Sequence, residues 1–275
     1  MRSLTLGVLA AVAATMAGVA QSPAPPARGA VVTDQDRTAI RQAAYDYAEG
    51  YYEGAAERME RAVHPGLIKR GVISPPGVGS LLAPMNAETL VELTRQGDGK
   101  DAPADKRSLA FALLDVRDNV ASAKIFTVGF NDYLHLAKQD GRWRIVHVLW
   151  QPPVAGAAVN ADADKAGVAQ AIKEYVDGAA AGDIARLERV IHPEAALRAF
   201  RASAPTGKFF LIEGNRDGVL SAVRAKAVTP QGPSAVVLDV YDTIASALVT
   251  SPQGVSYWHL ARQNGQWRLV NRLSR

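Results

Sequence analysis

Asp132 and His147 are the two side chains whose types and spacing best suit acid–base chemistry. They lie in two alternating segments, Asn131–Gln139 and Arg142–Trp150, which an Asp-Gly dipeptide at 140–141 joins as a hairpin. With an unbroken register, both side chains point to the same face of the sheet as diagonal neighbours. An imidazole titrates near neutral pH, and a carboxylate beside it orients and charges the ring. The pair predicts a general acid–base unit; the alternative is that His147 is a buried histidine with a satisfied hydrogen bond.

An apolar surface surrounds this pair on the same predicted face, and two tyrosines of the preceding helix lie opposite it. Large aromatic side chains in such a pocket favour a small apolar or planar ligand. The expected ligand-binding residues are Tyr47, Tyr51, Leu134, Trp143 and His147. We expect a small-molecule-binding protein. Two alternatives stay open: a cofactor-independent lyase or isomerase that uses His147 and Asp132, and an interaction scaffold whose interior is filled by side chains.

The sequence contains an internal repeat. Shifted by 128 positions, residues 40–65 fall on 168–193, and ten of the 26 positions carry the same amino acid. Shifted by 124 positions, residues 133–144 fall on 257–268. Matches in the same order predict two tandem copies of one domain. We expect copy one at residues 33–152, a linker at 153–163 and copy two at 164–275.

Each copy is predicted to begin with helices and to end with strands. Helical spacing and capping signals indicate helices at Asp36–Tyr52, Ala55–Val63, Asp164–Ala181 and Asp183–Ile191. A third short helix, Met85–Thr94 with Asn86 as its cap, is expected in copy one without a clear counterpart in copy two. Alternating residues predict strands at Leu109–Arg117, Val120–Val128, Asn131–Gln139 and Arg142–Trp150. This order predicts an α+β domain with its helices across one face of an antiparallel sheet.

Four motifs resemble the nuclear transport factor 2-like (NTF2-like) superfamily, and within it the group called "putative lumazine-binding". They are Tyr47-x-x-Gly50-Tyr51-Tyr52-Glu53-Gly54, His64-Pro65, Asp132-Tyr133-Leu134-His135-Leu136 and Asp140-Gly141-Arg142-Trp143-Arg144-Ile145-Val146. The resemblance covers nearly all of 34–150 and is looser over 165–275. It implies two cone-shaped domains, each with N-terminal helices on a curved antiparallel sheet and a pocket between them. The superfamily hosts many activities, so the resemblance names no reaction.

The opposite sheet face is shared by the two copies, which carry the same tyrosine, histidine and arginine at equivalent positions. A solvent-facing sheet gives no reason for this identity. We therefore predict that the two sheets pack back to back as an intramolecular pseudo-dimer within a monomeric chain. The predicted interface residues are Tyr133, His135, Arg144, Tyr257, His259 and Arg268. The alternative is that each histidine is a satisfied residue on a half-exposed sheet.

The predicted pocket face differs between the copies. Asp132 becomes Ser256, His147 becomes Asn271 and Tyr51 becomes Ala179. Copy two therefore lacks the acid–base pair, and we expect one usable site, in copy one.

Composition and motifs restrict the remaining function classes. The net charge of +4 comes from Lys and Arg spread among acidic residues, so we expect no nucleic-acid partner. The chain has no Cys, which excludes disulfides and thiolate metal sites. It has no Gly-rich phosphate loop, G-x-S-x-G or H-E-x-x-H motif. We expect no cofactor and no metal site.

The first twenty residues resemble a secretory signal peptide. Arg2 precedes an apolar run from Leu4 to Ala17, and small residues follow, so we expect cleavage after Ala20. The alternative is an uncleaved N-terminal anchor. Residues 21–32, with several prolines, are expected to be a linker. The predicted localisation is secreted or periplasmic, with no membrane contact after cleavage.

Overall fold

The computed structural model describes residues 31–75, 77–203, 205–226, 233–252 and 254–275. The expected signal peptide at 1–20 and most of the expected linker at 21–32 lie outside the described residues. Two similar domains follow each other along the chain, each with helices and a six-stranded sheet. The α+β prediction and the tandem arrangement are both confirmed.

The described residues of domain one form three α-helices and six strands. The helices are α1 (Asp34–Glu53), α2 (Ala56–Ala62) and α3 (Ala87–Gln96). The strands are β1 (Val63–Ile73), β2 (Leu81–Asn86), β3 (Leu109–Arg117), β4 (Val120–Thr127), β5 (Asn131–Gln139) and β6 (Arg142–Gln151). They are ordered β2-β1-β6-β5-β4-β3, and β1 runs parallel to β6 while every other pair is antiparallel.

Domain two repeats this plan. Its helices are α4 (Asp162–Ala181), α5 (Ile184–Val190) and α6 (Arg216–Arg224). Its strands are β7 (Ile191–Ala202), β8 (Phe209–Ile212), β9 (Ser234–Tyr241), β10 (Ile244–Ser251), β11 (Gly254–Gln263) and β12 (Gln266–Ser274). The sheet order β8-β7-β12-β11-β10-β9 matches that of domain one.

Local signals explain where the helices begin and end. Thr33 caps α1 through a capping box with Asp36, and Gly54 ends it in the left-handed region. Asn86 caps α3 by accepting a hydrogen bond from the Thr89 amide. The expectation that α3 has no counterpart was wrong, because Asn215 caps α6 in the same way at the equivalent place in domain two.

The β5–β6 hairpin turns where the Asp-Gly dipeptide predicts. Asp140 and Gly141 both have positive φ, 50° and 76°, as a two-residue turn of this kind requires. The register then changes within β6. Leu136 pairs with Ile145, but His135 pairs with His147, so one extra residue of β6 is accommodated as a bulge.

This bulge corrects the predicted sheet faces. A one-residue offset moves every later side chain to the other face. His147 and Leu149 therefore leave the helix-covered face, and Val148 and Trp150 take their place. Domain two has the same irregularity, between the pairs His259–Asn271 and Leu260–Leu269.

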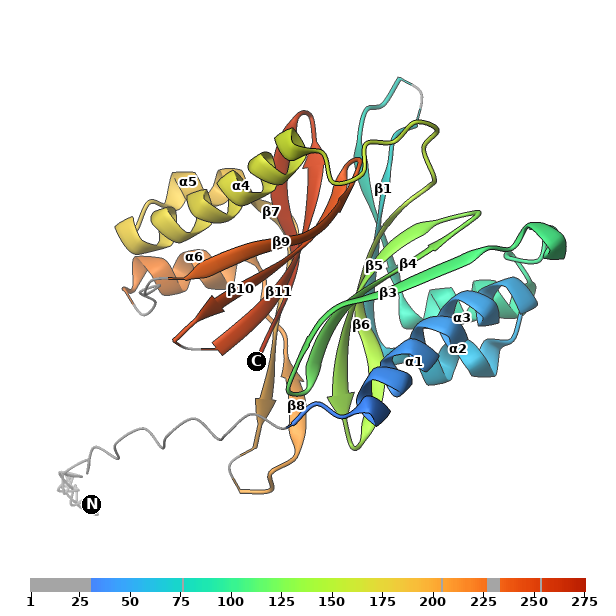
Figure 1. Ribbon diagram of the computed structural model, residues 1–275. Helices are drawn as coiled ribbons and strands as arrows, with labels where there is room; N and C mark the ends of the chain where they lie inside the picture. The colour runs from blue at the N-terminus through green and yellow to red at the C-terminus, as the bar shows by residue number, and fades with distance from the viewer. Residues whose placement is uncertain (1–30, 76, 204, 227–232, 253) are drawn as a thin grey trace, which may run out of the picture.

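The two sheets face each other in the middle of the molecule, and the helices lie on its two outer sides (Figure 1). Two clusters of buried side chains between the sheets contain residues of both domains. Each helix-covered face has a separate core of its own. The molecule therefore has three buried layers, one under each helical face and one between the sheets.

Candidate functional site

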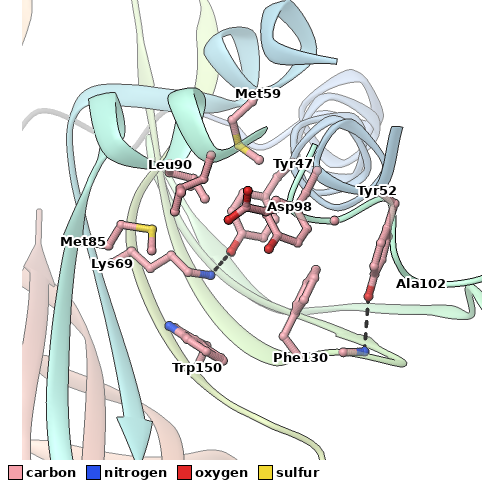
Figure 2. Close-up of a pocket in the computed structure, with 14 residues that line it drawn as sticks. Tyr47, Tyr52, Met59, Lys69, Met85, Leu90, Asp98, Ala102, Phe130 and Trp150 are labelled. Atoms are coloured by element: carbon pink, nitrogen blue, oxygen red, sulfur yellow. Dashed lines mark hydrogen bonds between the residues drawn. The ribbon is translucent and has the colours of Figure 1, made fainter. Parts of the chain in front are cut away.

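A cavity of about 330 Å³ lies between the helices and the sheet of domain one. Its walls come from α1, α2 and α3, from β1, β2 and β6, and from the loops after α3 and β4 (Figure 2). The lining residues are Tyr47, Tyr51, Tyr52, Met59, Lys69, Met85, Leu90, Leu93, Asp98, Gly99, Ala102, Gly129, Phe130 and Trp150. The volume falls at the lower end of the range of about 300–1,000 Å³ found for small-molecule sites.

Aromatic rings form much of the cavity wall. Tyr52 stacks on Phe130 with ring centroids 5.5 Å apart, and Tyr51 meets Phe130 edge-on at 6.0 Å. The Tyr52 hydroxyl donates to Thr127 Oγ1 at 2.7 Å and accepts from the Gly129 amide at 3.2 Å. These bonds fix the Tyr52 ring, so the wall is preformed for a flat, apolar molecule.

Lys69 is the charged residue at the inner end of this cavity, and Figure 2 shows its side chain directed toward Tyr47. Its Nζ donates to the Tyr47 hydroxyl and lies 3.5 Å from Asp132 Oδ2. The Tyr47 hydroxyl in turn donates to Asp132 Oδ2 at 2.5 Å. Lys69 of β1, Tyr47 of α1 and Asp132 of β5 therefore form one series of hydrogen bonds, called the polar chain below.

Aromatic faces enclose the Lys69 amine. Its Nζ lies 4.9 Å from the centroid of Trp150, 5.1 Å from Tyr47 and 5.6 Å from Phe130. Such contacts stabilise a cation and exclude water from it. The Lys69 side chain is only 8% exposed.

Burial has the largest effect on the pKa values of Lys69, Asp132 and Tyr47. It lowers the pKa of Lys69, and the carboxyl of Asp132 acts in the opposite direction. Burial raises the pKa of Asp132, against the effects of the Lys69 charge and the Tyr47 hydrogen bond. Burial, with the Asp132 charge, raises the pKa of Tyr47 well above its usual value. Burial therefore favours the uncharged form of each of these three side chains, compared with the same side chain in water.

Asp132 also has unused hydrogen-bonding capacity. Its Oδ1 atom is buried and has no hydrogen-bond partner within the described part of the chain. A buried acceptor without a partner costs about 1–3 kcal/mol.

The structure places the predicted pocket residues in three different settings. Tyr47 and Tyr51 line the cavity. Asp132 lies behind Tyr47, fully buried. Leu134 and Trp143 belong to the domain-one core and do not line the cavity; the Trp143 indole donates instead to Asp36 at 2.9 Å.

The predicted pairing of His147 with Asp132 is wrong. The bulge turns His147 toward the face that meets the other domain. On this face its Nδ1 lies 3.3 Å from the Nδ1 of His135, on the neighbouring strand β5. His147 is fully buried there and does not line the cavity. The acid–base pair proposed from an unbroken register therefore does not form.

Sequence reasoning missed Lys69, Phe130 and Trp150. Strand β1, which carries Lys69, was not predicted at all. In the unbroken register, Trp150 falls on the sheet face opposite to His147 and therefore outside the predicted pocket. The signal that was available lies in the repeat. When the sequence is shifted by 128 positions, Lys69 aligns with Leu197, and both residues lie on the strand that runs parallel to the last strand of their domain. The two copies therefore differ in charge at this position.

Domain two lacks this polar chain. The residues at the positions of Lys69, Asp132 and Trp150 are Leu197, Ser256 and Ser274. Trp258 stands where domain one has Leu134, and its ring meets Tyr175 edge-on at 4.8 Å. Arg272 donates to the Tyr175 hydroxyl at 2.9 Å. Tyr175 is the counterpart of Tyr47, which lines the cavity in domain one. In domain two it is instead in contact with two larger side chains, Trp258 and Arg272.

Four of the predicted interface residues meet between the sheets. The rings of His135 and His259 stack with centroids 3.4 Å apart. Tyr133 donates to Asp239 at 2.7 Å, and Tyr257 donates to Asp115 at the same distance. These paired contacts relate the two domains by an approximate two-fold axis.

The other two predicted interface residues, Arg144 and Arg268, are half-buried and pair with Ala137 and Ala261, which belong to the clusters between the sheets. Arg268 donates to Gln266 of its own strand. Two other arginines cross between the domains. Arg70 donates to Asn271 Oδ1 at 3.0 Å and Arg198 to the Val146 carbonyl at 3.2 Å.

No helix among the described residues is long and apolar enough to span a membrane. No cluster of three or more metal-ligating side chains was found over the same residues.

Comparison with known proteins identified one family. The sequence pattern of the family described as "putative lumazine-binding" matches residues 35–151 and again residues 163–274. The match confirms the resemblance drawn from the motifs and the presence of two copies. No curated protein matches the chain.

Solved structures similar to this chain include two described as NTF2-like proteins of unknown function. The one from Silicibacter pomeroyi DSS-3 has 21% identity and a TM-score of 0.33, and the match covers 40% of this chain and 92% of that one. The one from Methylobacillus flagellatus KT has 21% identity and a TM-score of 0.35, covering 45% and 96%.

Proposed function

The chain belongs to the "putative lumazine-binding" family, and from that premise we propose that its first domain binds a small, flat and largely apolar molecule. The observation that carries the proposal is the aromatic cavity of about 330 Å³ with Lys69 at its inner end. Aromatic walls supply the apolar contact area, and the Lys69 amine supplies a donor for an oxygen or nitrogen acceptor on the ligand. Lumazine, which the family name mentions, has this combination of a flat ring system and carbonyl acceptors.

The cavity argues against a filled interaction scaffold. Within domain one, a polar chain of Lys69, Tyr47 and Asp132 is kept at considerable desolvation cost. An apolar side chain at position 69 is compatible with the fold, as Leu197 shows in domain two. A purely structural role therefore does not explain the lysine.

Domain two is proposed to act as a structural partner for domain one. Its sheet covers the face of the first sheet that separate chains of this superfamily often bury by dimerising, so the chain is expected to be monomeric. We also propose export, on the basis of the N-terminal sequence that resembles a signal peptide.

Ligand binding is tested by fluorescence titration of the purified chain with lumazine and by thermal-shift screening of other flat, uncharged heterocycles. Two variants borrow residues from domain two. Lys69→Leu removes the donor, and Tyr51→Ala removes one ring of the aromatic wall by introducing the residue found at position 179. We expect ligand-induced shifts in the wild type that both variants lose while keeping their circular dichroism spectra. Identical shifts in the wild type and both folded variants would show that the ligands bind elsewhere.

A further inference from the structure

The Lys69 amine is placed for chemistry as well as for binding. It reaches the cavity from β1, and the next atoms in its hydrogen-bond chain are the Tyr47 hydroxyl and Asp132 Oδ2. A primary amine in a water-poor apolar cavity, with a proton-transfer chain behind it, has the components needed to condense with a carbonyl group.

We propose that Lys69 forms a reversible imine with an aldehyde or ketone that enters the domain-one cavity. This inference rests on the proposed function, because the carbonyl compound must first occupy the cavity. It narrows the ligand to a flat, largely apolar molecule with a reactive carbonyl at one end.

The reaction requires no oxidant, reductant or further reactant. The Nζ lone pair attacks the carbonyl carbon, a C–N bond forms, and the carbonyl oxygen takes up a proton to give a carbinolamine. Loss of that hydroxyl as water, with a second proton delivered to it, leaves the imine. Nζ releases two protons in total, and both leave in the water molecule.

Tyr47 and Asp132 are placed to move these protons. The Tyr47 hydroxyl lies between the amine and Asp132 Oδ2, so a proton released by Nζ can pass to the carboxylate through it. Asp132 Oδ1, which has no partner in the described part of the structure, is a further acceptor. Burial lowers the pKa of Lys69, which increases the fraction of the nucleophilic free amine near neutral pH.

An ion pair between Lys69 and an anionic ligand fits the site less well. Asp132 Oδ2 already lies 3.5 Å from Nζ, so a counter-charge is present without a ligand. The same burial that disfavours the ammonium form also disfavours an added anion. A neutral carbonyl compound needs no cationic partner, and it adds no charge to the buried site.

The test is trapping of the imine in the full chain. The protein is incubated with benzaldehyde near neutral pH, reduced with sodium cyanoborohydride, digested and mapped by mass spectrometry. Thermal shift with benzyl alcohol, which has the same ring but cannot form an imine, measures entry into the cavity separately. Lys69→Leu is the matched control, and Asp132→Asn keeps the lysine while removing the carboxylate.

We expect a benzyl group on the Lys69 peptide in excess of the label on all exposed lysines, loss of that adduct in Lys69→Leu, and slower labelling in Asp132→Asn. Label confined to exposed lysines, with benzyl alcohol still stabilising the wild type, would overturn the imine and leave the proposed function standing. If neither probe acts on the wild type and the flat ligands above also give no shift, both proposals fail.

Discussion

Acidification is expected to destabilise the interface between the sheets through its buried histidines. His135, His147 and His259 are fully buried, and their pKa values are lowered well below the usual value, chiefly by burial. Neighbouring titratable groups lower two of these pKa values further: His259 acts on His135, and the Arg198 charge acts on His147. The Nε2 atoms of all three lack hydrogen-bond partners among the described residues.

The sign follows from proton linkage. An unfolded histidine titrates at about 6.5, whereas a folded one with a lower pKa stays neutral, so the unfolded state binds more protons as the pH falls below 6.5. Stability is therefore retained above that pH and is lost below it. A histidine that stays neutral in the folded state down to pH 5 contributes a loss of about 2 kcal/mol between pH 7 and pH 5. Three such residues give about 6 kcal/mol, a large share of the typical 5–15 kcal/mol of a folded protein.

The substitution His147→Asn removes one of the three histidines and so measures its share of the stability lost between pH 7 and pH 5. Domain two already has Asn271 at the equivalent position, where its amide lies 3.3 Å from His259 Nδ1. The variant should therefore preserve the packing and lose about 2 kcal/mol less than the wild type between pH 7 and pH 5. Urea unfolding at the two pH values, followed by tryptophan fluorescence, measures the difference. Equal losses for the variant and the wild type would refute the reasoning, because they would show that His147 does not contribute to the loss.

Three further predictions concern stability at pH 7, each measured by urea unfolding. Tyr133→Phe removes the 2.7 Å hydrogen bond to the buried carboxylate of Asp239 and should cost about 1–2 kcal/mol, whereas no change would show that the bond is replaced. Asp36→Ala removes the acceptor for the Trp143 indole and should cost about 2 kcal/mol, with Asp36→Asn expected to recover part of it. Gly141→Ala places a side chain at a φ of 76° and should cost about 1–2 kcal/mol, unless the turn changes type.

The helices and the hairpins could be predicted from sequence because their signals are local. Capping by Thr33 and Asn86 and the Asp-Gly turn at 140–141 act within a few residues, and the structure has all three. The bulge in β6 has no such signal. Residues 145–149 are all buried because β6 is covered on both faces, so alternation cannot mark which side chain faces which layer.

The candidate site failed to emerge from sequence for a related reason. Lys69 is a charged residue in a strand, which usually indicates solvent, but here it is 6% exposed beneath the helices. Its environment depends on the parallel pairing of β1 with β6, a contact between residues about 80 positions apart, as Lys69 and Val148 illustrate. Local patterns do not specify such a pairing.

The buried layer between the sheets and the two buried layers under the helices are under different physical constraints. Between the sheets, a residue near the two-fold axis meets its own counterpart, as Ser122 meets Ser246 at 2.8 Å and His135 stacks on His259. A change in one copy alone breaks a contact that the other copy still presents, so the interface favours the same residues in both. Under the helices no such coupling exists, and each cone packs on its own. One cone can then be filled by a side chain such as Trp258, which stabilises the molecule, while the other keeps a cavity and a buried lysine that destabilise it. The cavity and the buried lysine of domain one are thus tolerated, despite their desolvation cost, because the shared interface and the core of domain two supply stability.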